Sequence, residues 1–226
     1  VPELVEALRG KPYEARLKCD GSSCTVWRDE DGTLHVASRN WELRERTATG
    51  AENVYWRAAR KYDWSQLPQG VAMQFEVVGP GVQGNPMGLS ELEGRAFTAY
   101  HHKAGSRLPW GDLAYFAQEI GIPEAPVVAH GDYFDLSDDQ MRNIADSQKY
   151  PNGKPAEGVV IRSLVTAGDG TWRLGTGGGI GGGDARGLGR TGQAGLEAVR
   201  FGDEFRDQRR QVSHGGICPS GNRARR

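Results

Sequence analysis

The order of apolar and polar positions up to residue 167 predicts a mixed fold of short helices and strands. Short apolar or β-branched runs between turn residues predict strands, and apolar residues spaced three or four positions apart predict helices. Strands are expected at residues 15–19, 24–27, 34–37, 71–78, 96–101 and 158–162. Helices are expected at residues 3–9, 52–62, 111–120 and 137–147, the last with a capping box formed by Ser137 and Gln140. No internal repeat is present in the sequence.

The composition changes sharply near Ala167. About half of the 33 glycines lie between residues 168 and 221, and no lysine occurs after Lys154. Such a segment buries little apolar surface and therefore cannot offset the entropy lost on ordering. We expect a folded domain at residues 1–166 and a Gly/Arg-rich, mostly disordered tail at residues 167–226, with at most a short helix at 196–205.

The overall charge and the cysteine content argue against several classes of protein. The formal net charge is −1, so any argument for binding nucleic acid must be local. Cys19, Cys24 and Cys218 form no CxxC pair and are odd in number, which argues against a disulfide framework and a zinc site. The start, VPELVEALRG, lacks the basic-then-apolar order of a signal peptide, and no apolar run is long enough to span a bilayer. We therefore expect a cytoplasmic location and no membrane partner.

The first candidate for chemistry is Lys18, in the sequence KCDGSS, where a predicted strand gives way to a glycine turn. An unperturbed lysine amine has a pKa of about 10.4, so it must lose its proton before it can act as a nucleophile. Partial burial and nearby cations lower such a pKa and make attack possible. The alternative is an exposed turn lysine beside the neighbouring Asp20.

Three further motifs follow along the chain: Ser38-Arg39-Asn40, FEVVGPGVQGN and EGVVIR. Glu76 of the second motif lies inside an otherwise apolar strand, and Glu157 of the third lies at the start of another. A carboxylate in such a strand is costly to bury unless it is paired, bonded to a ligand or bound to a metal. The alternative for each is an acid at the exposed rim of a turn.

Taken together and in this order, the motifs resemble those of the lysine-adenylating nucleotidyltransferases: DNA ligases, RNA ligases and mRNA capping enzymes. KCDG is similar to the nucleophile motif of these enzymes, and EGVVIR to their late acidic strand. FEVVGPGVQGN is similar to the RNA ligase form of the middle motif, where DNA ligases more often have a DGE-type sequence. The resemblance covers residues 2–163 and is greatest to nick-sealing RNA ligases. It implies an α+β fold, a nucleotidyltransferase (adenylation) domain with antiparallel sheets flanked by helices.

The resemblance implies a role for each matching residue. Lys18 would attack the α-phosphate of ATP, expel pyrophosphate and hold AMP through a phosphoramide bond. Arg39 would contact the nucleotide or the terminal phosphate, and Glu76 would accept hydrogen bonds from the ribose hydroxyls. Glu157 would help to place Mg²⁺, or Mn²⁺ in its stead, near the phosphates.

Two other positions match nucleotide-binding residues of the family. Phe97, in the sequence RAFTAY, occupies the position where these enzymes stack an aromatic ring on adenine, and an ordinary core phenylalanine is the alternative. Ser23 occupies a position that helps to hold the phosphate in relatives, although a serine after a turn is a weak signal.

The implied function is that of an ATP-dependent RNA ligase, which joins 3′-hydroxyl and 5′-phosphate ends in RNA repair. AMP passes from ATP to Lys18 and then to the 5′-phosphate, and it leaves when the 3′-hydroxyl attacks. The partners would be ATP and RNA ends or a nicked duplex. Two alternatives stay open: a DNA ligase or capping-type enzyme, and a non-catalytic nucleotide- or RNA-binding remnant of a ligase.

The chain departs from the family pattern after the late acidic strand. Relatives continue with a strand whose lysines contact the α-phosphate, whereas no lysine follows here, and the pattern predicts no strand around Arg173 or Arg186. This loss argues against full activity of the chain. A shifted reading frame and a natural RNA-binding tail both explain the change in composition. Ligases also need a second nucleic-acid-binding element, and the position of the first motif so close to Val1 suggests a missing upstream domain.

Overall fold

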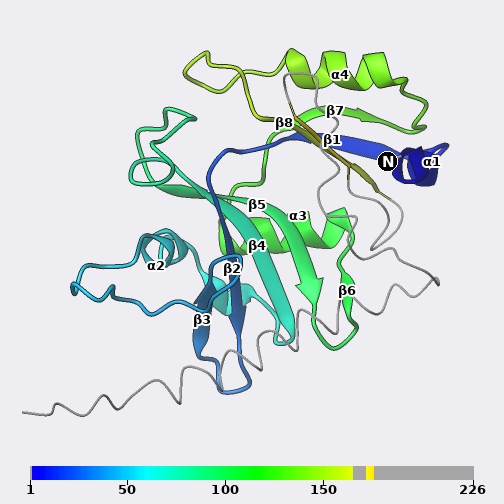
Figure 1. Ribbon diagram of the computed structural model, residues 1–226. Coiled ribbons are helices and arrows are strands. Elements are labelled where there is room, and N and C mark those ends of the chain that lie inside the picture. The colour runs from blue at the N-terminus through cyan, green and yellow to red at the C-terminus, as the bar shows by residue number, and fades with distance from the viewer. Residues whose placement is uncertain (1, 165–171, 176–226) are drawn as a thin grey trace, which may run out of the picture.

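Two antiparallel β-sheets and the helices packed on them form the part of the chain that the computed structural model describes, residues 2–164 and 172–175 (Figure 1). In chain order the strands are β1 (Tyr13–Leu17), β2 (Ser22–Arg28), β3 (Leu34–Ala37), β4 (Val71–Val78), β5 (Glu93–His101), β6 (Ser106–Arg107), β7 (Val127–Gly131), β8 (Gly158–Ser163) and β9 (Trp172–Gly175). The helices are α1 (Pro2–Leu8), α2 (Val54–Ala59), the 3-10 helix η1 (Trp64–Gln66), α3 (Trp110–Ile120) and α4 (Asp138–Asp146). One sheet has the strand order β7-β1-β8-β9, and the other has the order β3-β2-β4-β5-β6.

Side-chain caps and glycines fix the ends of the helices. The side chain of Asn53 accepts a hydrogen bond of 3.0 Å from the backbone N–H of Tyr55 at the start of α2. At α4, the Ser137 hydroxyl accepts from the N–H of Gln140, and the Gln140 side chain accepts from the N–H of Ser137, which confirms the predicted capping box. Helix α3 ends at Gly121, whose φ of 80° lies in the left-handed region that favours glycine. None of the helices in the described residues is long and apolar enough to cross a bilayer.

Buried apolar side chains form three clusters. The largest packs α2 and α3 against the five-stranded sheet, and the second packs α1 and α4 against the four-stranded sheet (Figure 1). The third cluster lies where the two sheets meet, and we call it the inter-sheet cluster. Its buried members are Leu17, Cys19, Val78, Met87, Ala125, Tyr150 and Ala156. This cluster includes the residues on both sides of Lys18, so the candidate nucleophile lies at the junction of the sheets.

The structure confirms the predicted fold class, and each strand or helix expected within residues 2–164 overlaps an observed one. Strands β3 and β4 have the predicted bounds, whereas β1 begins at Tyr13 and ends at Leu17, before Lys18. The sequence pattern missed η1, β6, β7 and β9. Strand β7 is an edge strand whose side chains are all exposed or half-buried, and its apolar run, residues 127–129, is too short to distinguish a strand from a loop.

Strand β9 corrects the expectation that no strand surrounds Arg173. Its backbone pairs antiparallel with β8, with Arg173 opposite Val160. The edge of β8 that faces away from β1 offers backbone donors and acceptors, and such an edge can pair with a segment of unremarkable sequence. The rest of the predicted tail, including Arg186 and the helix expected at 196–205, lies outside the described residues.

Candidate functional site

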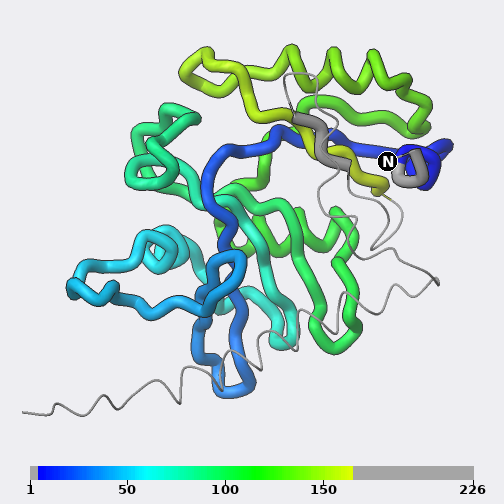
Figure 2. The backbone as a smooth tube through the Cα atoms, viewed as in Figure 1, coloured from blue at the N-terminus to red at the C-terminus, as the bar shows by residue number. Residues whose placement is uncertain are grey.

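Lys18 lies immediately after β1, between a strand of the four-stranded sheet and a strand of the five-stranded sheet. The course of the chain through this blue segment can be followed in Figure 2. Its backbone N–H donates a 2.9 Å hydrogen bond to the carbonyl of Gly158, the first residue of β8. The N–H of Leu17 donates to the carbonyl of Pro126 at 2.8 Å. The backbone that leads to the lysine is therefore held by segments from two distant parts of the chain.

Gly21 of the KCDG turn packs directly against β4. A Cβ atom at this position would lie 2.2 Å from the carbonyl oxygen of Val77 and 2.8 Å from Cγ1 of Val78. Because one of these atoms belongs to the backbone, no other residue fits without moving the strand. The same Cβ would lie 3.1 Å from Cγ of Glu76, so the glycine lets the lysine turn approach this acid.

The Lys18 amine forms an ion pair with Oε1 of Glu157, the residue that precedes β8. The side chains are 28% and 42% exposed, so a ligand can reach both. Strands β1 and β8 are antiparallel with Leu17 opposite Val159, which brings the end of one strand to the start of the other. The structure thus unites the proposed nucleophile and the proposed metal ligand, which are 139 positions apart in sequence.

Tyr150 fixes the backbone of both members of this pair, although no motif in the sequence predicts this. Its hydroxyl donates to the carbonyl of Lys18 at 2.8 Å and accepts from the N–H of Glu157 at 3.0 Å. Burial, together with the negative charge of Asp20, raises the pKa of Tyr150 well above its ordinary value, so the hydroxyl stays protonated and able to donate. No sequence signal links Tyr150 to the lysine, because 132 positions separate them.

Glu76 lies half-buried on β4, beside the lysine turn. It is opposite Ser23 on β2 and Arg95 on β5, so these three side chains share one face of the sheet. Burial, and then the negative charge of Glu76, raise the pKa of the Cys24 thiol well above its ordinary value. The structure therefore brings Glu76 and Ser23 to the same region as Lys18, and their contacts with a nucleotide stay a prediction.

Arg39 and Phe97 occupy the five-stranded sheet and its rim. Arg39 is exposed in the turn that follows β3, at the end of the sheet where the antiparallel strand β2 begins. Phe97 is half-buried at the point where the register between β4 and β5 shifts, which is a bulge. It belongs to none of the three core clusters, which disfavours the alternative of an ordinary core phenylalanine. The roles of both residues toward a nucleotide stay predictions.

A stack of two arginines on a tryptophan joins the sheets near the site, and no motif in the sequence predicts it. The guanidinium groups of Arg16 and Arg162 lie over the ring of Trp110, with Cζ atoms 4.1 and 5.1 Å from its centroid. Arg162 also donates to the Phe97 carbonyl at 2.6 Å and to the Thr98 hydroxyl at 2.8 Å. These contacts connect β1 and β8 of the four-stranded sheet with β5 of the five-stranded sheet and with α3, which packs on it.

Glu157 is the residue that the resemblance expects to place the metal ion. Among the described residues, no group of three or more His, Cys, Asp or Glu side chains is arranged to hold a metal. Mg²⁺ is commonly bound by one or two carboxylates together with substrate phosphates and water. A single carboxylate beside the lysine therefore fits a metal ion that binds together with the phosphates of a nucleotide. It does not fit an ion that the described protein groups would hold alone.

The sequence model of the RNA ligase family matches residues 11–172, a range that includes every residue of the candidate site. Antiparallel sheets flanked by helices are the architecture that the resemblance implied, and the structure has two such sheets. The chain belongs to the RNA ligase family. The match confirms the resemblance inferred from KCDG, FEVVGPGVQGN and EGVVIR.

Solved structures of Naegleria gruberi RNA ligase have a similar fold. An apo mutant aligns with a TM-score of 0.65 and 27% identity, over 78% of this chain and 52% of that chain. The enzyme with PPi aligns with a TM-score of 0.64 and 27% identity, and a mutant with ATP and Mn with 0.63 and 26%, at the same two coverages. This chain thus spans about half the length of the solved structures that it matches. A comparison with curated proteins gives no match.

Proposed function

We propose that this chain carries out adenylation as part of an ATP-dependent RNA ligase that joins 3′-hydroxyl and 5′-phosphate ends. The observation that carries the proposal is the Lys18 amine beside Glu157, on a turn held by Gly158 and Tyr150. Membership in the RNA ligase family supports the same chemistry. The Naegleria gruberi enzymes, solved with PPi and with ATP and Mn, support ATP and a divalent metal as the small-molecule partners.

In the first step the unprotonated amine of Lys18 attacks the α-phosphorus of ATP. A nitrogen–phosphorus bond forms, the bond from the α-phosphorus to the bridging oxygen breaks, and pyrophosphate leaves with that electron pair. The proton released from the nitrogen passes to solvent. The fixed turn would place the amine for this attack, and such positioning is the main contribution of a protein to phosphoryl transfer.

In the next two steps the adenylyl group passes to RNA and then leaves. An oxygen of the 5′-phosphate attacks the phosphorus of Lys18–AMP and frees the lysine, and the 3′-hydroxyl then attacks the 5′-phosphate and expels AMP. Arg39 and Ser23 would contact phosphate oxygens during these transfers. Glu76 would accept hydrogen bonds from the ribose hydroxyls, and Phe97 would stack on the adenine.

Two further charges complete the proposed site. Glu157 would hold Mg²⁺ or Mn²⁺ together with the phosphates, and the bound ion would offset their negative charge. Arg173 lies on β9, which follows β8 in the sheet and stands where the family resemblance implies a lysine-bearing strand. In sequence this strand thus carries an arginine where the resemblance implies a lysine.

Substrate choice tests the proposed function. The chain is incubated with ATP, Mg²⁺ and 5′-phosphorylated nicked duplexes that differ only in whether the strands at the nick are RNA or DNA. We expect AMP transfer and sealing at the RNA nick. Sealing of the DNA nick alone would assign the chain to the DNA ligases and overturn the proposal. Nucleotide binding without any AMP transfer would overturn it in favour of a non-catalytic remnant.

A further inference from the structure

An exposed tryptophan lies among arginines in the loop that follows β3. Residues 38–46, here named the arginine loop, contain Trp41 with a relative exposure of 58%, and Arg39, Arg44 and Arg46 are also exposed. A single exposed aromatic ring is common on protein surfaces. An exposed aromatic ring with exposed arginines nearby in the same loop combines the two groups that bind single-stranded nucleic acid, by base stacking and by contacts with phosphates.

The backbone that carries Trp41 is fixed by hydrogen bonds. The N–H of Ser38 donates to the carbonyl of Trp41 at 2.8 Å, and the N–H of Trp41 donates to the Ser38 hydroxyl at 3.3 Å. Two residues later, Leu43 donates to the carbonyl of Val36 at 2.8 Å and accepts from the indole N–H of Trp56 at 2.8 Å. A ring on an ordered turn loses less conformational entropy when it binds a ligand than a ring on a free loop.

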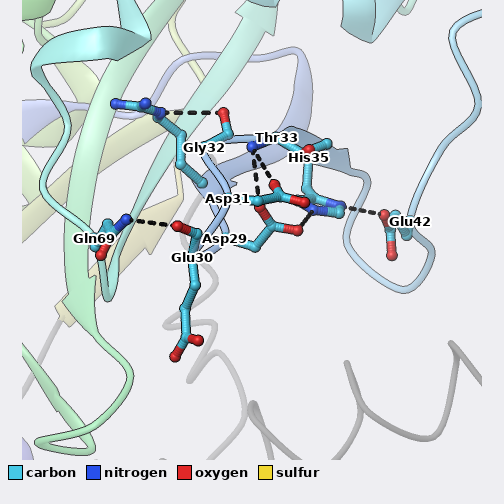
Figure 3. A network of polar contacts seen from close by, with 9 residues as sticks. Asp29, Glu30, Asp31, Gly32, Thr33, His35, Glu42 and Gln69 are labelled. Atoms are coloured by element: carbon cyan, nitrogen blue, oxygen red, sulfur yellow. Dashed lines mark hydrogen bonds and ion pairs between the residues drawn. The ribbon is translucent and has the colours of Figure 1, made fainter.

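The first acid of the arginine loop is engaged by a histidine outside it. Oε1 of Glu42 lies 2.6 Å from Nδ1 of His35, and Nε2 of the same ring lies 2.9 Å from Oδ2 of Asp29 (Figure 3). Each ring nitrogen of His35 thus lies within hydrogen-bond distance of one carboxylate oxygen. The Glu42 carboxylate therefore contacts the β2–β3 hairpin and, among the described residues, is not a counter-ion to Arg44 or Arg46.

The second acid is engaged in the same way, and two loop arginines are left without an acidic partner. Glu45 pairs with Arg60 at 2.6 Å, and Arg60 lies beyond α2, outside the arginine loop. Within the part of the chain that the structure describes, neither Arg44 nor Arg46 forms an ion pair, and Arg46 donates to a backbone carbonyl. The loop therefore presents positive charge, although the whole chain is almost neutral.

The arginine loop leaves the sheet at the end nearest the lysine turn. Strands β2 and β3 are antiparallel, with Thr25 opposite Ala37, so the chain leaves β3 beside the start of β2. Strand β2 itself begins four residues after Lys18. A polynucleotide whose end reaches the lysine can therefore continue over this loop.

We propose that the arginine loop is a docking surface for the RNA strand, in which Trp41 stacks on a base and Arg44 and Arg46 contact backbone phosphates. This inference rests on the proposed function, because it names where the RNA substrate lies. The loop arginines, whose neighbouring acids pair with residues outside the loop, favour a polyanion as the occupant, because they can contact its phosphates.

The test is the affinity of the full chain for a fluorescently labelled, 5′-phosphorylated RNA oligonucleotide, measured by anisotropy over a range of salt concentrations. Trp41→Ala should weaken binding on the order of tenfold, since stacking on one aromatic ring contributes at that level. Trp41→Phe should restore most of the affinity. Tyr115→Ala removes a ring of similar exposure, 60%, from α3 and serves as the matched control with unchanged affinity.

The salt dependence tests the cations separately. Arg44→Ala and Arg46→Ala should each reduce the slope of log affinity against log salt by about 0.7, which corresponds to one lost phosphate contact on a single strand. Equal affinity of Trp41→Ala and the unaltered chain, with equal thermal unfolding midpoints, would overturn the proposal. The proposal would also be overturned, in favour of a protein contact, if the unaltered chain self-associates and Trp41→Ala abolishes that self-association while its RNA affinity is fully retained. Failure of the proposed function is seen independently, as the absence of a lysine–AMP adduct when the unaltered chain is given ATP without RNA.

Discussion

Replacement of Tyr150 by phenylalanine tests how firmly the backbone around Lys18 must be held for adenylation. The change removes one hydroxyl, and with it the hydrogen bonds to the Lys18 carbonyl and the Glu157 N–H, while the ring keeps its place in the inter-sheet cluster. Tyr150 is only 4% exposed, so water replaces these bonds poorly. Leaving buried backbone groups without partners costs about 1–3 kcal/mol.

We expect this loss to appear both in stability and in rate. The free energy of unfolding, measured with urea, should fall by about 1–3 kcal/mol. If the same loss affects the adenylation transition state, the rate should fall roughly 5- to 150-fold, and we expect on the order of tenfold. Because the pKa of Tyr150 is raised, its hydroxyl stays protonated around neutral pH, and the rate ratio of variant to wild type should not change there.

The assay is single-turnover formation of the lysine–AMP adduct, followed by intact mass at several ATP concentrations. A positioning role predicts a lower maximal rate with a nearly unchanged KM for ATP, whereas a merely structural role predicts fewer active molecules at the normal rate. Tyr133→Phe, which alters a tyrosine that is 68% exposed, is the matched control. A wild-type maximal rate for Tyr150→Phe would refute the reasoning.

Three further results are expected. Raising the Mg²⁺ concentration should partly restore adenylation by Glu157→Ala and restore that of Glu76→Ala little, because only Glu157 is assigned to the metal. The measurement is the yield of lysine–AMP adduct against Mg²⁺ concentration. Equal restoration of both variants would show that these two roles are wrongly assigned. Burial raises the pKa of Cys19 to about 12 and raises the pKa of Cys24 well above its ordinary value. Both thiols should therefore alkylate slowly at neutral pH, as measured by peptide mapping. Their protons are retained in the folded chain but lost from the unfolded chain above about pH 8.5, so urea melts should show their contribution to stability declining above that pH. Arg162→Ala should lower the free energy of unfolding, measured with urea, by roughly 1.5–3 kcal/mol, because the hydrogen bonds donated by the charged guanidinium are lost. An unchanged free energy of unfolding would show that the arginine–tryptophan stack does not help to join the sheets.

The sequence predicted those elements whose signals are local. Strand β4 is an apolar run that ends at a glycine, and the start of α4 is marked by Ser137 and Gln140, so both were located closely. The order of KCDG and EGVVIR along the chain was enough to associate Lys18 with Glu157, through the family resemblance. Their actual contact depends on the pairing of β1 with β8.

The features that the sequence missed depend on contacts between distant segments. Tyr150 matters because its hydroxyl meets residues of two different strand ends, and an isolated tyrosine before a turn does not indicate this. Likewise, Arg16 and Arg162 read as ordinary strand residues until α3 places Trp110 beside them. Strand β9 lies in a glycine-rich region, where pairing with the edge of β8 outweighs the weak local propensity.

The mass of the intact protein after incubation with ATP and Mg²⁺ tests the central claim most directly. The account predicts that the wild-type chain gains the mass of one adenylyl group, that peptide mapping locates it on Lys18, and that Lys18→Ala and Lys18→Arg gain none. Arginine fails for a chemical reason, since its guanidinium stays protonated and cannot act as the nucleophile. An adduct of undiminished yield on Lys18→Ala would contradict the account.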